Sequence, residues 1–247
     1  MYNNFVLSWI GIGFLAFVGS LLVTAPYGRH FRKGWGPGID NRLGWIVYES
    51  PSLIIIPLFF FFQDFELTSA IGIMFLAFFL HYFHRTLIFP FRIKTKGKLV
   101  PLGIVVSAFV FNVINASIIG IFLTTIQNFP DQYVFDPRFL LGLLLFILGA
   151  VINISSDNHL ISLRSKNQTG YSIPRKGLFR WISCPNHFGE IIEWTGFAIM
   201  LWSLSGASFA IWTAANLIPR SLDHHKWYQK NFTDYPVNRK AIIPGLL

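Results

Sequence analysis

The sequence predicts an all-α, polytopic membrane protein with seven transmembrane helices and an ordered loop cap on its cytosolic side. Hydrophobic residues make up 53% of the 247 residues and charged residues only 13%, against roughly 25% charged in ordinary soluble domains. Uncharged apolar runs recur at about the 20-residue length that crosses a bilayer core. Basic residues gather in alternate loops, as the positive-inside rule requires of a multi-pass protein.

Six apolar runs supply the predicted helices. The last run is too long for one crossing and contains the turn-forming segment SLSGAS at 203–208, so we expect two shorter helices there. The first run lacks a preceding basic region, and we expect it to be retained as a helix rather than cleaved as a signal. Together the helices form one integral-membrane domain, 1–247. The runs are 5–25, 43–62 apart from Glu49, 67–91 apart from a polar cluster, 99–126, 139–154, and 188–219 apart from its two glutamates.

The loops between these runs alternate in charge. Lys and Arg gather in 26–42, 92–98, 164–180 and from Arg220 to the end, whereas the intervening loops are poor in both. The positive-inside rule then predicts a cytosolic C-terminus and an N-terminus across the membrane, in a bacterial inner membrane or the endoplasmic reticulum. A basic face without a repeated Lys/Arg–aromatic pattern favours lipid headgroups or an anionic cofactor over nucleic acid. We infer no obligate protein partner.

The first cytosolic loop, 26–42, is dense in Gly, Pro and aromatic residues. Three of its glycines alternate with Trp35 and Pro37, and this composition makes a helix improbable. We expect an ordered cap at the membrane face, with a solvated connector as the alternative.

Two polar positions lie in the second and third apolar runs. Glu49 stands just before Pro51, and desolvation favours the neutral form of a carboxyl, so Glu49 could hold a proton at neutral pH and donate it. A structural hydrogen bond is the alternative role for Glu49. The segment HYFHRT ends the third run; in an α-helix His81 and Arg85 would share one face, with Tyr82 about 100° away. Tyr82 could instead be an aromatic belt residue.

Polar stripes mark the fourth and fifth runs. Asn112 and Asn115, three residues apart, are expected to bond a neighbouring helix. Asn153, Asp157 and Arg164 lie close to one face of the fifth run. A row of polar residues that runs along one helical face and ends in Arg favours a ligand-binding groove over isolated polar residues that only assist helix packing.

Two further stripes lie near the C-terminal end. In WISCPNHFGEIIEW, residues 181–194, a helix would place Asn186, Glu190 and Glu193 on one face, with Trp194 beside them. Buried carboxylates are costly, so this stripe indicates a function. Beyond it, three residues at a spacing of four share a helical face: Arg220, His224 and Tyr228.

Several other kinds of site are not indicated. HExxH and paired Glu-x-x-His patterns are absent and His187 with Glu190 is only a fair pair, so no metal is predicted. One cysteine excludes an internal disulfide. No dinucleotide-binding GxGxxG follows a strand and no nucleophile elbow occurs. What remains is a cytosol-facing polar pocket suited to a large anionic cofactor and a lipid-soluble substrate.

Several long blocks of the sequence carry a resemblance to one known family. They are YGRH, ESPS, HYFHRT, INISSDNHLISLR, YSIPRKGLFRWISCPNHFGEIIEWTGFA and HHKWYQKNFTDYPVNRKAIIP. On these blocks the chain resembles the steroid 5α-reductase family, the NADPH-dependent 3-oxo-steroid 4-ene reductases, from about Tyr27 to the C-terminus. The resemblance implies a seven-helix membrane reductase that transfers hydride from NADPH to C5 of a steroid 4-ene, with a proton added at C4.

The resemblance also implies roles for individual residues. Glu49 and Tyr82 correspond to the family's catalytic pair at the substrate 3-keto oxygen, Trp194 to a residue beside the nicotinamide and steroid, and Glu190 suits the carboxamide. Arg164 and its basic neighbours suit the phosphates. The positions that match family residues around NADPH are Asn153, Asp157, Arg164, Tyr171, Asn186, Glu190, Arg220, His224 and Tyr228, together with Tyr27 and Lys98.

Two departures from the family pattern leave alternatives open. Tyr48 stands where close relatives often have Gln, which affects the steroid preferred, and Ser172 replaces a frequent Arg, which removes one phosphate contact. A reductase of polyprenal or of a long-chain enoyl thioester would share the cofactor half. A membrane methyltransferase would not need Glu49 and Tyr82, and a transporter would favour an internal duplication that the sequence lacks. Glu193 has no predicted role.

Overall fold

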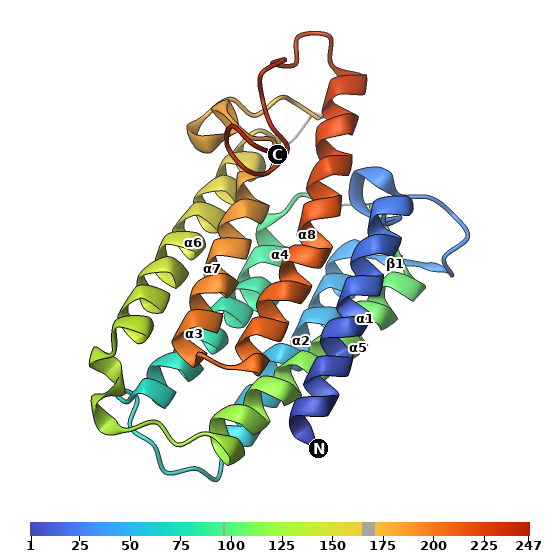
Figure 1. The fold of residues 1–247 in the computed structure, drawn as a ribbon. Helices are drawn as coiled ribbons and strands as arrows, with labels where there is room; N and C mark the ends of the chain where they lie inside the picture. The colour runs from blue at the N-terminus through green and yellow to red at the C-terminus, as the bar shows by residue number, and fades with distance from the viewer. Residues whose placement is uncertain (96, 165–170) are drawn as a thin grey trace. The chain divides into compact units, whose positions relative to one another are not determined.

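The structure, a computed structural model, describes residues 1–95, 97–164 and 171–247. The basic loop 164–180 and the basic segment 92–98 therefore lie partly outside the described residues. Figure 1 traces the chain from blue to red. Its elements are α1 (Tyr2–Leu22), η1 (Gly28–His30), β1 (Gly38–Asp40), α2 (Asn41–Phe60), α3 (Ala70–Phe83), η2 (His84–Ile88), α4 (Phe89–Arg92), β2 (Leu99–Pro101), α5 (Leu102–Ile121), η3 (Phe122–Ile126), η4 (Asp131–Phe135), α6 (Pro137–Ser162), η5 (Gly177–Arg180), α7 (Pro185–Leu201) and α8 (Leu204–Asn231).

Five helical stretches of the described chain are long and apolar enough to cross a membrane. The mainly helical membrane class is thereby confirmed, while the count of seven crossings stays a prediction. The run 188–219 forms two helices, α7 and α8, as expected, with the break at Trp202 and Ser203. The five stretches are Tyr2–Leu22, Asn41–Phe60, Ala70–Arg92, Leu102–Ile126 and Pro137–Ser162.

The chain divides into two compact units, which we describe separately. Unit 1 comprises Met1–Thr24, Leu141–Ile199 and Ala207–Leu247. Unit 2 comprises Ala25–Leu140 and Met200–Gly206. Each unit carries some of the residues that the sequence marks as functional.

In unit 1, helices α6 and α7 run antiparallel and approach at glycine positions (Figure 1). A Cβ on Gly189 would lie 2.5 Å from the amide nitrogen of Asn153 and 2.7 Å from the carbonyl oxygen of Gly149. A Cβ on Gly196 would lie 2.5 Å from the amide nitrogen of Phe146. Side chains of any size would push the backbones apart, so glycine permits the close packing that small residues give to membrane helices.

Helix α8 joins α1 within the same unit. Trp212 donates its indole N–H to the carbonyl oxygen of Trp9 at 3.0 Å, and the centroids of the two rings are 4.6 Å apart. A Cβ on Gly13 would lie 2.9 Å from the Trp212 ring, so glycine makes room for the indole. The helix continues without a break through Pro219 to Asn231 and includes the amphipathic segment predicted there.

The chain beyond α8 folds back within unit 1. The amide of Ser183 donates to the carbonyl oxygen of Lys240 at 2.8 Å. The amide of Lys240 donates to the carbonyl oxygen of Trp181 at 2.9 Å. These bonds form a short parallel bridge between Ile182 and Lys240. The bridge fixes the approach to α7 just before its first residue.

Unit 2 contains a small antiparallel ribbon that the all-helical prediction lacks. Strands β1 and β2 pair with Ile39 opposite Val100. The carboxylate of Asp40 then accepts hydrogen bonds from the amides of Arg42 and Leu43 at 3.0 and 3.1 Å, and so caps the start of α2. Three-residue strands are too short to show an alternating pattern in the sequence.

The α-helical spacing expected for His81 and Arg85 is wrong, because the chain forms a π-helix, η2, from His84. Pro90 has no N–H to donate to the preceding turn, which interrupts the regular ladder. The guanidinium carbon of Arg85 lies 4.8 Å from the Trp45 ring centroid. The Trp45 indole N–H donates to the Arg85 carbonyl oxygen at 3.0 Å.

Candidate active site

A ladder of four polar side chains joins α6 to α7 in unit 1. Asn153 donates its amide N–H to the carboxylate of Glu190 at 3.2 Å and to the backbone oxygen of Asn186 at 3.0 Å. Asn186 in turn donates to the carboxylate of Asp157 at 3.1 Å. The structure therefore brings together four residues that the family resemblance places around NADPH.

The ladder lies where the two helices are held close by glycine. Asn153 and Asp157 are buried, whereas Asn186 and Glu190 are half-buried. Buried polar groups need partners, and each amide in the ladder satisfies a neighbouring acceptor. An ionised carboxylate has about four acceptor sites, so Glu190 and Asp157 can accept further hydrogen bonds from a ligand.

Arg164 lies beyond the end of α6 rather than on the helix, because α6 ends at Ser162. Its guanidinium carbon is 5.6 Å from the centroid of the Tyr171 ring. Tyr171 in turn meets Trp227 of α8 edge-on at 5.1 Å between centroids. The predicted phosphate residue is thus linked by ring contacts to the helix that carries the third polar stripe.

The stripe on α8 is helical throughout, as its spacing predicts. The His224 ring lies 5.7 Å from that of His187 on α7, and His187 Nδ1 is 2.8 Å from the hydroxyl of Ser221. Tyr228 is buried and stacks on Tyr235, with the ring centroids 5.3 Å apart. Arg220, the first residue of the stripe, is half-buried.

Two residues at the end of the segment 181–194, Glu193 and Trp194, lie in the core of unit 1. Trp194 is 1% exposed and packs among aromatic rings, with the Phe209 centroid at 4.3 Å and Phe197 at 5.5 Å. Glu193 is 2% exposed on the same helix. The predicted position of Trp194 beside a nicotinamide stays a prediction.

A second polar cluster of unit 1 was missed by sequence reasoning. The Ser183 hydroxyl lies 2.6 Å from His225 Nδ1 and 2.6 Å from the hydroxyl of Tyr235. Burial, and then the charges of Arg239 and Lys240, lower the pKa of His225, while burial raises the pKa of Tyr235. These residues are scattered along the chain and have no motif spacing, so only their folding together reveals the cluster.

In unit 2, Asn112 of α5 is the hub around the predicted catalytic pair. Its side-chain oxygen accepts from the Ser52 hydroxyl at 3.0 Å and from the Tyr82 hydroxyl at 3.4 Å. Its amide donates to the backbone oxygen of Tyr48, next to Glu49, at 2.7 Å. The inter-helix role expected for Asn112 is confirmed.

The amide of Asn115, on the same helix as Asn112, donates to the carbonyl oxygen of Phe111 at 2.8 Å. Tyr82 is 5% exposed and Glu49 is half-buried. Pro51 cannot donate to the carbonyl oxygen of Val47, which instead accepts from the Ser50 hydroxyl at 2.9 Å. The helix around Glu49 is thus held by side chains where its backbone ladder is broken.

The remaining predicted cofactor residues, Tyr27 and Lys98, belong to unit 2. Tyr27 precedes η1, and the Lys98 backbone bonds Thr95 and Asn41 at 2.9 and 3.0 Å. Within 1–95, 97–164 and 171–247, no group of three or more His, Cys, Asp and Glu side chains could hold a metal ion.

Known proteins resemble this chain over most of its length. Residues 98–247 match the family described as 3-oxo-5-alpha-steroid 4-dehydrogenase. Steroid 5-alpha-reductase DET2 of Arabidopsis thaliana is 43% identical over 229 residues, covering 90% of this chain and 87% of that protein. 3-oxo-5-alpha-steroid 4-dehydrogenase 1 is 40% identical over 250 residues in Bos taurus (96% and 93% covered) and over 238 in Homo sapiens (95% and 91%). The chain therefore belongs to the 3-oxo-5-alpha-steroid 4-dehydrogenase family, and it is an oxidoreductase.

Proposed function

We propose that the protein reduces the 4,5 double bond of 3-oxo-4-ene steroids with NADPH and yields 5α-dihydrosteroids. Hydride is added at C5 and a proton at C4. The observation that carries the proposal is the buried hydroxyl of Tyr82, directed by an amide that also bonds the backbone beside Glu49. Family membership favours a steroid over a polyprenal or an enoyl thioester.

Glu49 and Tyr82 activate the conjugated ketone in this proposal. Both donate hydrogen bonds to the 3-keto oxygen, with Glu49 in its protonated form. Negative charge grows on that oxygen as hydride reaches C5, and donors held in place in dry surroundings stabilise such charge far better than water does. In the structure the single O–H of Tyr82 donates to Asn112 at 3.4 Å, a long hydrogen bond, and in our proposal the incoming 3-keto oxygen replaces Asn112 as its acceptor. Asn112, itself bonded to Ser52 and to the Tyr48 backbone, keeps the hydroxyl near that position until the steroid binds.

The polar set of unit 1 has the chemistry that NADPH requires. Carboxylate acceptors in the α6–α7 ladder suit the NH₂ of the carboxamide, and Glu190 is the residue we assign to it. The guanidinium of Arg164, held against Tyr171, suits a phosphate, to which arginine binds in a bidentate manner. NADPH supplies the hydride when it is bound. The further residues that we assign to the cofactor are Asn153, Asp157, Tyr171, Asn186, Trp194, Arg220, His224, Tyr228, Tyr27 and Lys98.

We further propose seven membrane crossings, made by α1, α2, α3 with η2 and α4, α5 with η3, α6, α7 and the apolar part of α8, which ends at Pro219. The basic loops then face the cytosol together with the C-terminus, and the loop 26–42 caps that face. NADPH is a cytosolic solute, so this orientation gives it access to the basic loops. The two units serve one function as a single domain in the lipid bilayer, with no obligate protein partner.

The test is NADPH consumption by the full chain purified in detergent, with testosterone or progesterone as substrate. We expect stoichiometric formation of the 5α product, identified by its stereochemistry at C5. Failure to reduce either steroid, together with reduction of a long-chain enoyl thioester, would contradict the proposed substrate. Release of methylated product from S-adenosylmethionine would contradict the reaction class.

A further inference from the structure

Unit 2 contains a cavity of about 610 Å³ that the proposed reaction does not use. It is formed by the segment between η3 and α6 and by the turn that follows α7. Its wall carries four aromatic residues, Phe129, Tyr133, Phe135 and Trp202, and one ion pair, Asp136 with Arg138. Phe135 and Trp202 are 76% and 62% exposed, so the aromatic wall is open to the surroundings.

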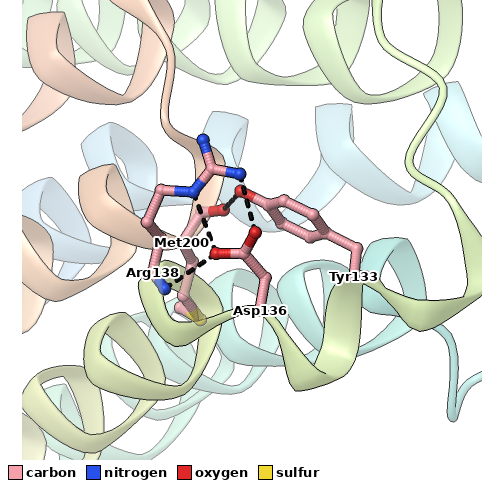
Figure 2. A network of polar contacts seen from close by, with 4 residues as sticks. All are labelled: Tyr133, Asp136, Arg138 and Met200. Atoms are coloured by element: carbon pink, nitrogen blue, oxygen red, sulfur yellow. Dashed lines mark hydrogen bonds and ion pairs between the residues drawn. The ribbon is translucent and has the colours of Figure 1, made fainter.

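Arg138 is held in one orientation by Asp136. One carboxylate oxygen accepts from the Arg138 amide at 2.8 Å and from Nε at 2.9 Å, and the other accepts from Nη2 at 2.7 Å (Figure 2). These hydrogen bonds lower the pKa of Asp136 to about 2, so the pair stays ionised at neutral pH. The side-on edge of the guanidinium, Nε with Nη2, is therefore occupied.

The end-on edge of the same guanidinium, Nη1 with the second N–H of Nη2, is available. Among the residues that the structure describes, Nη1 of Arg138 makes no hydrogen bond, and the side chain is 43% exposed. Two parallel N–H groups on one edge match two oxygens of a phosphate. Asp136 thus presents Arg138 as a preoriented anion receptor.

Aromatic rings fix the plane of this receptor. The guanidinium carbon lies 5.7 Å from the Tyr133 centroid and 5.5 Å from the Trp202 centroid. Tyr133 donates its hydroxyl to the carbonyl oxygen of Met200 at 3.1 Å (Figure 2). Trp202 has a backbone φ of 41°, which is strained for a residue other than glycine. Such strain persists only where the surroundings hold it, and it often accompanies a functional site.

The ends of two membrane-spanning candidates flank the cavity. One helical stretch ends at Ile126, immediately before the segment that lines the cavity, and the next begins at Pro137. In the topology proposed above, the cavity therefore lies at the level where a bilayer meets water, the level that Tyr and Trp prefer. Phospholipid phosphates lie at the same level.

We propose that this cavity binds the headgroup of a membrane phospholipid through its phosphodiester. Arg138 donates to two phosphate oxygens, and Phe135 and Trp202 pack against the glycerol and the first carbons of the acyl chains. A free phosphate would make no use of the aromatic wall, and a steroid offers no anionic group to the guanidinium. The combination of a fixed cation and exposed aromatic rings fits an anion with an attached apolar chain.

The test measures binding of dihexanoyl phosphatidylglycerol to the full chain in detergent, by native mass spectrometry and thermophoresis. We expect one phospholipid per protein. Arg138→Gln should weaken binding about tenfold or more, because a charge-assisted hydrogen-bond pair is lost. Trp202→Ala should weaken it about threefold, by loss of apolar contact. The control is Arg175→Gln, which removes an exposed Arg–Asp pair outside the cavity and should leave binding unchanged.

Three further ligands distinguish a phospholipid from a free phosphate and from a steroid. Dihexanoylglycerol lacks the phosphate and should bind at least tenfold more weakly, while inorganic phosphate and testosterone should fail to displace the phospholipid. Wild-type affinity in Arg138→Gln, or displacement by either competitor, would overturn the proposal. Arg138→Lys provides a second variant, which keeps the positive charge but lacks the two parallel N–H groups of the guanidinium. It should melt at the wild-type temperature and still bind the phospholipid more weakly. Affinity equal to that of the wild type would also contradict the proposal.

Discussion

The two units use buried polar groups in different ways. In unit 1, four polar side chains are shared between α6 and α7, and glycines bring their backbones together. In unit 2, a single amide, that of Asn112, links three helices around one tyrosine hydroxyl. A large polar ligand needs many anchors spread along helices, whereas activation of one carbonyl oxygen needs a few donors held in one direction.

The comparison predicts that variants in the two units separate turnover from cofactor binding. Glu49→Gln in unit 2 should lower kcat by about 100-fold, because the amide of Gln is a much weaker acid than the carboxyl that we propose donates to the developing oxyanion. The dissociation constant for NADPH should change by less than about twofold, because the proposal assigns Glu49 to the steroid ketone and not to the cofactor. Loss of even one weak hydrogen bond to NADPH, about 0.5 kcal/mol, would raise the constant by slightly more than that. Steady-state kinetics and NADPH titration measure the two quantities.

The matched control is Glu66→Gln, an exposed carboxylate in the same unit. It should leave both constants unchanged. A Glu49→Gln protein that keeps a near wild-type rate would remove Glu49 from the mechanism and, with it, the division of roles between the units.

Glu190→Ala in unit 1 should show the opposite defect. Loss of the acceptor for Asn153 and for the carboxamide is expected to raise the NADPH dissociation constant about tenfold, from a net hydrogen-bond contribution of about 1.5 kcal/mol. At saturating NADPH the rate should recover most of its wild-type value. Asp223→Asn, on α8 of the same unit, is the control. Unchanged cofactor affinity in Glu190→Ala would contradict the assigned role.

The close crossing of α6 and α7 can be broken directly. Gly189→Ala places a methyl group 2.5 Å from a backbone nitrogen, and overpacking of this kind costs about 1–3 kcal/mol in the free energy of unfolding. Thermal melting in detergent measures the loss. Gly19→Ala, where a Cβ meets nothing within 4 Å, should not destabilise. Equal melting temperatures for the two variants would mean that α6 and α7 can move apart without loss of stability.

The smallest predicted effect concerns pH. Burial lowers the pKa of His225 in the folded protein, so below the unfolded value of about 6.5 the unfolded chain binds more protons than the folded one. Stability from neutral His225 is complete above about pH 6.5 and is lost as the pH falls toward the lowered folded pKa. The slope should not exceed about 1.4 kcal/mol per pH unit.

His225→Asn should flatten this pH dependence in melting curves recorded from pH 7.5 to 5.5. Ser183→Ala retains the histidine and removes its hydroxyl partner, so it should melt at lower temperature while keeping a slope on the acidic side. An identical slope in His225→Asn and wild type would assign the acid sensitivity to other groups.

The parts of the site that follow a helical period could be predicted from the sequence. The spacings of Asn153 with Asp157 and of Asn186 with Glu190 follow helical geometry, and the structure joins all four residues. Hydropathy likewise located the helices, because length and apolar content decide whether a segment can cross a bilayer.

Features without a period were not predictable. The π-helix at 84–88 depends on Pro90 and on the packing of Trp45, so the prediction that His81 and Arg85 share one α-helical face was wrong. The ribbon of β1 and β2 comes from segments separated by about sixty positions, a pairing that only the folded chain reveals. The cavity beside Trp202 similarly combines distant segments of unit 2.

The bond between Trp9 and Trp212 joins residues 203 positions apart, and this separation constrains the order of biogenesis. Chains fold as they are synthesised, N-terminal parts first. Almost all of unit 2 emerges as one continuous stretch, so it can fold before the remainder exists. Helix α1 must instead wait in the lipid until α8 is made, and a bilayer, unlike water, tolerates an apolar helix that has not yet met its partner.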